Sequence, residues 1–93
     1  MQKIRTTVKI AGKDYVISGY DTEEYVQRVG TYVNRRMSEL SLATRMPVQQ
    51  VAVLTAISAV DDMMKARDEV TRLRTELDRA HEEIEILKRA KEQ

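Results

Sequence analysis

An apolar repeat in the last third of the chain constrains the fold most. Its spacing alternates between three and four residues, the heptad pattern of a coiled coil. A single helix lying on its own domain would need a wider apolar stripe. The repeat therefore predicts self-association through a coiled-coil stalk over residues 63–93. With Val70 at position a, the a and d positions form a heptad seam of eight residues: Met63, Ala66, Val70, Leu73, Leu77, Ala80, Ile84 and Leu87.

Charges beside the heptad seam favour a parallel pair of helices. Glu69, Glu76 and Glu83 occupy g positions, and the e positions are basic or can become so: Arg67, Arg74, His81 and Lys88. In a parallel in-register pair each g residue meets an e residue of the partner, so acid faces base. In an antiparallel pair glutamate would face glutamate, which is repulsive. Because Ala66 and Ala80 leave room for a second dimer, we also expect a tetramer of two antiparallel dimers.

The beginning of the chain predicts a β-hairpin over residues 4–18. Apolar and polar residues alternate in both arms, and Gly12-Lys13 between them suits a two-residue type II′ turn. That turn would pair Ile10 with Tyr15 and Val8 with Ile17, placing four apolar side chains on one face.

A first helix follows, with Asp21 or Thr22 as its cap and Glu24 in position for a capping box. One apolar stripe extends to about Ser41, and Gly30 beside it indicates close packing. The stripe residues are Val26, Val29, Val33, Met37 and Leu40.

The second helix is predicted to be much longer. Residues 41–46 form the connection, Pro47 suits the first helical position, and no Gly or Pro interrupts the chain before about residue 90. The first turns are apolar nearly all round, which predicts burial in a dimer. The fold class is therefore α+β, with a dimeric ββα head over residues 1–62 and a parallel coiled coil over residues 63–93. The apolar residues are Val51, Ala52, Val53, Leu54, Ala56, Ile57, Ala59 and Val60.

The composition argues against catalysis. The 93 residues include no Cys, so neither disulfides nor thiolate chemistry are available. His81 is the one histidine and has no convergent partners, and Asp61 and Asp62 point about 100° apart on a helix. We expect no enzyme activity, no cofactor and no metal site.

The charge balance and the hydropathy guide the choice of partner. Residues 1–47 hold eight basic and five acidic residues, an excess too weak for nucleic acid but compatible with an acidic protein. No Phe or Trp is present to stack on bases. No apolar run approaches the roughly 20 residues of a membrane span, and the start of the chain lacks a signal-peptide pattern. We expect a cytoplasmic protein that binds neither nucleic acid nor membrane.

Four short stretches occur in an order that spans nearly the whole chain and leads into the charged repeat. They are Val8-x-Ile10-x-Gly12-Lys13-x-Tyr15, Tyr32-Val33-Asn34-x-x-Met37-x-x-Leu40, Thr44-Arg45-x-Pro47 and Ala52-Val53-Leu54-x-Ala56-Ile57. No single stretch is specific. The ordered set, at this length, resembles the ZapA family of bacterial Z-ring-associated division proteins.

The resemblance implies a partner that periodicity cannot reveal, the tubulin-like division protein FtsZ. It implies a homodimer, pairing into a homotetramer, that cross-links and bundles FtsZ filaments at mid-cell and stabilises the Z-ring. The family's binding surface is basic and lies on the head. The matching residues are Lys13 and Arg45, with Asn34, Arg35 and Arg36 as further candidates. Lys13 stands where family members often have Arg, which would replace a forked contact with a point charge.

Two other interpretations remain open at this point. One is a coiled-coil structural adaptor for a different partner. The other is a small DNA-binding dimer, since a short β segment followed by two helices is similar to ribbon-helix-helix repressors. The hairpin has few basic residues on one face and the second helix is too long, which disfavours DNA binding.

Overall fold

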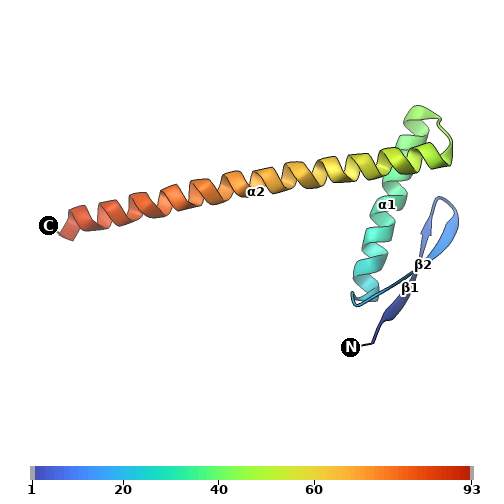
Figure 1. Cartoon of the computed structure of the whole chain (residues 1–93), viewed down its shortest axis with the longest axis horizontal. Helices are drawn as coiled ribbons and strands as arrows, with labels where there is room; N and C mark the ends of the chain where they lie inside the picture. Colours follow the sequence, from blue (N-terminus) through green and yellow to red (C-terminus); the bar gives the residue numbers. More distant parts are fainter. Residues whose placement is uncertain (1, 93) are drawn as a thin grey trace. The chain divides into compact units, whose positions relative to one another are not determined.

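The computed structural model describes residues 2–92, which form an antiparallel hairpin followed by two helices (Figure 1). The elements are β1 (Ile4–Ile10), β2 (Lys13–Gly19), α1 (Glu23–Thr44) and α2 (Val48–Glu92). The predicted order and the α+β class are confirmed. By its internal contacts the chain divides into a first unit, residues 1–58, and a second unit, residues 59–93. The head and stalk boundaries at residues 62 and 63 stay predictions.

The hairpin turn differs from the predicted one. Its two loop residues are Ala11 and Gly12, and both have positive φ, 52° and 80°. Positive φ at both central residues is the signature of a type I′ turn, not type II′. Ile10 therefore pairs with Lys13 and Val8 with Tyr15. The predicted register was wrong by two residues, an even shift that keeps the apolar side chains on one face.

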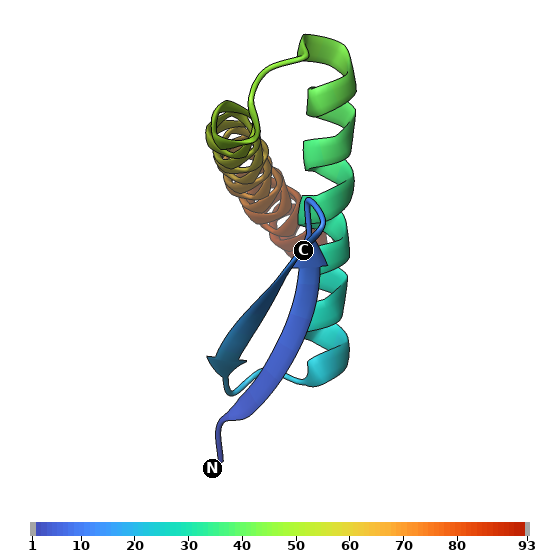
Figure 2. The same cartoon turned by 90° about the vertical axis from the view of Figure 1, so that its right-hand side faces the viewer.

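In the first unit α1 packs against β1, as Figure 2 shows. The buried core lies at this contact. Val8 is 1% exposed, and Met37 on α1 is buried as well. A Cβ added to Gly30 would lie 2.8 Å from the Cβ of Val8, so glycine permits the close approach. The close packing predicted at Gly30 is confirmed. Thr6 is also buried in this contact, and its hydroxyl has no hydrogen-bond partner within the described residues.

Helix α1 begins as predicted and ends later. The Thr22 hydroxyl accepts a hydrogen bond from the Tyr25 N–H at 3.2 Å, so Thr22 is the cap and the Asp21–Glu24 box does not form. The helix continues to Thr44, beyond the predicted end at Ser41. Arg45 then takes a left-handed conformation, φ 55°, and donates its N–H to the Ser41 carbonyl at 2.9 Å. This closes the helix without glycine.

Helix α2 begins at Val48, one residue later than predicted. The carbonyl of Pro47 accepts the Val51 N–H at 3.0 Å, so Pro47 is a cap residue rather than the first helical one. Val51 and Thr55 are buried within the first unit, whereas Val53 and Ile57 are each 60% exposed. The predicted burial of this segment in a dimer stays a prediction. Within residues 2–92 neither helix is long and apolar enough to cross a membrane.

Candidate functional site

Lys13 is the first residue of β2 and is exposed beside a groove. Residues of the hairpin tip, α1 and the start of α2 form the walls. Arg45 lies three residues before Val48, a wall residue, so the chain places this second cation within a few residues of the groove. The groove combines an apolar floor with a cation at its edge, which suits a partner with apolar and acidic groups. The lining residues are Ile10, Ala11, Lys13, Tyr15, Met37, Val48, Gln49 and Ala52.

Asn34 has a structural partner. Its side-chain oxygen accepts a hydrogen bond from the Ala11 N–H at 2.9 Å, across 23 residues of sequence. The contact holds the hairpin turn, with its strained positive φ at Ala11, against α1. Because Asn34 is half-buried and its oxygen is engaged, it positions the turn beside Lys13 rather than offering a free contact.

Arg35 and Arg36 are neighbours with different surroundings. The Arg36 guanidinium binds the Ser58 hydroxyl on α2 through Nε at 3.2 Å and Nη2 at 2.5 Å, and Nη1 lies 3.7 Å from a Glu39 carboxylate oxygen. Arg36 thus joins α1 to α2 within the first unit. Arg35 is exposed, with its Nε 4.0 Å from Glu39. Of the two, Arg35 is the one available to a partner.

Arg45 combines a backbone role with a free side chain. Its left-handed backbone ends α1, and its side chain is exposed. Of the candidates predicted from the sequence, Lys13 and Arg45 have exposed side chains. Within residues 2–92 neither side chain forms a hydrogen bond or an ion pair.

The heptad seam has no cover within the chain. Its six large members range from 44% exposed at Met63 to 67% exposed at Leu87, and Ala66 and Ala80 are exposed as well. A row of apolar side chains this regular is stable in water only when another helix covers it. The exposure is what an unpaired strand of a coiled coil would show. The seam residues are Met63, Ala66, Val70, Leu73, Leu77, Ala80, Ile84 and Leu87.

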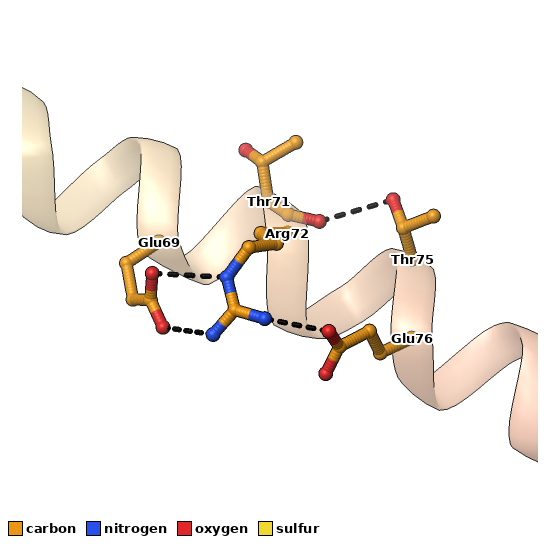
Figure 3. A network of polar contacts seen from close by, with 5 residues as sticks. All are labelled: Glu69, Thr71, Arg72, Thr75 and Glu76. Atoms are coloured by element: carbon orange, nitrogen blue, oxygen red, sulfur yellow. Dashed lines mark hydrogen bonds and ion pairs between the residues drawn. The ribbon is translucent and has the colours of Figure 1, made fainter.

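A polar network beside the seam was missed by the sequence analysis. Arg72 donates to both Glu69 oxygens and, from Nη1 at 2.5 Å, to Glu76 (Figure 3). The hydrogen bond from Arg72 lowers the pKa of the Glu69 carboxyl and raises the pKa of Arg72. The spacing of three and four residues was the available signal. Arg72 therefore competes for two of the glutamates expected to pair with a partner helix.

A second ion pair lies near the start of the second unit. Lys65 binds Asp61 at 2.8 Å, and this hydrogen bond raises the pKa of the lysine. Asp61 is thereby engaged in a surface pair with a residue one turn away. Among residues 2–92, no three His, Asp or Glu side chains gather in the arrangement a metal ion requires.

Comparison with known proteins finds one family over most of the chain. The pattern of the family described as "Cell division protein ZapA" matches residues 6–90. A cell division protein ZapA of Halalkalibacterium halodurans is 37% identical over 68 residues, covering 72% of this chain and 75% of that protein. One from Geobacillus sp. (strain WCH70) is 35% identical over 83 residues, covering 88% and 95%.

A solved structure agrees with the fold. The ZapA mutant dimer from Geobacillus stearothermophilus superposes with a TM-score of 0.69 at 34% sequence identity. The match covers 84% of this chain and 92% of that chain. The arrangement of a hairpin, a helix and a longer helix is therefore shared with a protein solved independently.

Proposed function

Because the chain belongs to the ZapA family of cell division proteins, we propose that it binds FtsZ filaments and cross-links them into bundles without catalysing a reaction. The observation that carries this proposal is the division of the chain into two unlike units. The first has a small core and exposed cations beside a groove, and the second has an uncovered heptad seam. One unit is suited to bind a filament and the other to join copies of the chain.

The filament-binding surface centres on Lys13 and Arg45. Both side chains are exposed, and neither contributes to the buried core. Lys13 lines the groove, and Arg45 lies three residues before Val48, which lines it too. Arg35, a further candidate from the sequence, is 67% exposed. It points about 160° away from Met37, a wall of the groove, so we do not assign it to this surface. Asn34 and Arg36 act on the surface indirectly, since their polar groups hold the turn and α2 in place.

Self-association supplies the second binding site that cross-linking needs. The Geobacillus stearothermophilus relative is described as a dimer, and the heptad seam gives this chain a surface for the same purpose. We assign a parallel dimer to the seam and an antiparallel pairing of dimers to the tetramer. With a binding surface at each end, a second weak contact becomes effectively intramolecular, so weak contacts can make a strong bridge.

Disulfide cross-linking tests the orientation. A single Leu73→Cys substitution in this cysteine-free chain places two thiols opposite each other at a d position of a parallel in-register pair. Mild oxidation should then give a covalent dimer rapidly. The parallel arrangement would be contradicted if Leu73→Cys cross-linked slowly on its own. This contradiction would also require that rapid cross-linking appear only when one chain carries Cys at position 73 and its partner carries Cys at a distant seam position.

Co-sedimentation with polymerised FtsZ tests the binding function. The full chain should pellet with the filaments, and Lys13→Ala/Arg45→Ala should pellet much less. The melting temperature of the double variant should stay nearly unchanged, because surface substitutions usually change the free energy of unfolding by no more than about 0.5 kcal/mol. Raising the salt concentration on the unsubstituted protein should mimic the double variant, since both weaken charge attraction. Unchanged pelleting by a correctly assembled double variant would exclude these two residues as the contact.

A further inference from the structure

All the aromatic side chains of this chain are tyrosines, and all four are between 44% and 62% exposed. Two of them, Tyr25 and Tyr32, lie on α1, each with an arginine three residues later. The Arg28 Cζ lies 5.4 Å from the Tyr25 ring centroid, and the Arg35 Cζ lies 5.7 Å from that of Tyr32. These four residues form a tyrosine–arginine row. Tyr and Arg, together with Trp, are enriched at the energetic centres of protein interfaces.

The row lies on the face of α1 that the first unit leaves open. At about 100° per residue, Tyr32 and Arg35 point about 140–160° away from the buried Met37. The row also lies away from the groove beside Lys13, because Met37 is one of the walls of that groove. It is therefore separate from the surface assigned to filament binding.

The spacing of the row is that of a helix–helix contact. Tyr25, Arg28, Tyr32 and Arg35 follow one another at intervals of three, four and three residues. This is the heptad spacing with which one helix covers another, but with tyrosine and arginine in place of aliphatic side chains. A covering helix would need apolar groups against the rings and acceptors opposite the guanidinium groups.

The charges of the row are available to such a partner. Within residues 2–92 no ion pair joins Arg28 to a carboxylate, and Arg35 has only the 4.0 Å approach of Glu39. A guanidinium over an aromatic ring still presents its N–H edge to acceptors, and carboxylates fit that edge. The two arginines are seven residues apart, about 10 Å along the helix.

We propose that the tyrosine–arginine row is a second docking surface, which takes an acidic amphipathic helix of another protein with carboxylates at seven-residue spacing. Leucine-like side chains of that helix cover Tyr25 and Tyr32, and its carboxylates bind Arg28 and Arg35. The protein would then connect bundled filaments to a further component through a face of α1 that filament binding does not use.

A peptide-binding measurement on the full chain tests this surface. The probe is a fluorescent, alanine-rich helical peptide of about 21 residues in which Glu and Leu alternate at three- and four-residue intervals. Fluorescence anisotropy at low salt should show saturable binding. The matched peptide with Gln for every Glu should not bind. Arg28→Gln/Arg35→Gln should weaken binding by about tenfold or more, and Tyr25→Ala/Tyr32→Ala should weaken it as well.

Matched variants separate this surface from the others. Arg79→Gln/Arg89→Gln removes the same charge from exposed positions of α2 and should bind the peptide as the unsubstituted chain does. The Arg28→Gln/Arg35→Gln variant should keep its oligomeric mass and its pelleting with FtsZ. Equal binding of the Gln peptide, or an equal loss in the control variant, would overturn the proposal. If Arg28→Gln/Arg35→Gln changed the oligomeric mass, the row would instead contact a second copy of the chain. If the variant no longer pelleted with FtsZ, the row would belong to the filament site. Either result would also overturn the proposal.

Discussion

The two units of this chain differ in how they remove their apolar side chains from water. In the first unit, residues distant in sequence bury one another: Val8 from β1, Met37 from α1 and Val51 from α2 are all buried. In the second unit, every described residue is exposed, including the large apolar members of the heptad seam. The first unit has a core of its own, whereas the second has only half of one. An apolar pattern therefore predicts where burial occurs, but only the tertiary contacts show whether the same chain supplies it.

The largest effect is expected when the second unit loses its seam. Leu77→Glu/Ile84→Glu places two charges where the coiled coil would bury apolar side chains, and an unpaired buried charge is very costly. The variant should lose the tetramer and remain a dimer held by the first unit. Size-exclusion chromatography with light scattering measures this directly. An unchanged mass would show that the heptad seam is not an interface of the assembly.

A smaller loss is expected when the core of the first unit is overfilled. Gly30→Ala adds a methyl group 2.8 Å from the Cβ of Val8, a side chain too enclosed to move away. Overpacking of this kind costs about 1–3 kcal/mol, partly offset by about 1 kcal/mol from the better helix propensity of alanine. Urea unfolding at fixed protein concentration measures the difference.

Gly19→Ala is the matched control, because nothing lies within 4 Å of the added group there. It should leave the unfolding midpoint nearly unchanged. Equal effects of the two substitutions would contradict the close contact between α1 and β1.

The same core offers a substitution with the opposite sign. The buried Thr6 hydroxyl lacks a partner within the described residues, whereas the buried Thr55 hydroxyl donates to the Val51 carbonyl at 2.8 Å. Thr6→Val keeps the shape and removes the unsatisfied group, so it should stabilise the protein by about 1 kcal/mol. Thr55→Val should stabilise the protein less than Thr6→Val, or not at all, because it removes a hydrogen bond that is made. Thermal unfolding compares the two, and a destabilised Thr6→Val would indicate a hydrogen bond at that hydroxyl.

The smallest effect is expected at the exposed network of the second unit. Arg72→Ala removes both contacts to Glu69 and Glu76, and exposed ion pairs contribute little. Because Arg72 lowers the folded-state pKa of Glu69, its stabilisation is present above the ordinary glutamate pKa, about 4.3, and disappears as the pH falls through the lower folded value.

Circular dichroism melts at neutral and acid pH should therefore show a small loss for Arg72→Ala that vanishes at the acid end. Arg79→Ala is the control, since no ion pair involves Arg79 in the described part of the chain. A loss that persists at acid pH would mean that Arg72 stabilises the helix by packing or propensity instead.

Local patterns predicted the elements well and their details less well. The alternation in the hairpin gave the correct apolar face, but the register depends on two positive φ values at Ala11 and Gly12. Ala11 carries no sequence signal for such a conformation, because alanine rarely adopts it. The same holds for Arg45, whose left-handed backbone ends α1 three residues beyond the predicted end.

The candidate site shows a similar division. Its exposed cations, Lys13 and Arg45, were predicted from the sequence through family resemblance. The partners of Asn34 and Arg36 lie 23 and 22 residues away in sequence, and such contacts leave no local periodic trace. Helical spacing could have indicated the structural role of Asn34. It lies four residues after Gly30 and three before Met37, and so adjoins the buried face of the helix.

The division of labour between the two units is tested most directly by comparing filament binding with filament bundling in one variant. Leu77→Glu/Ile84→Glu leaves the surface of Lys13 and Arg45 intact but removes the seam that would join copies of the chain. Pelleting should show that the variant still binds polymerised FtsZ, while right-angle light scattering should show that it no longer bundles the filaments. Full bundling by a variant whose reduced mass has been verified would contradict the account.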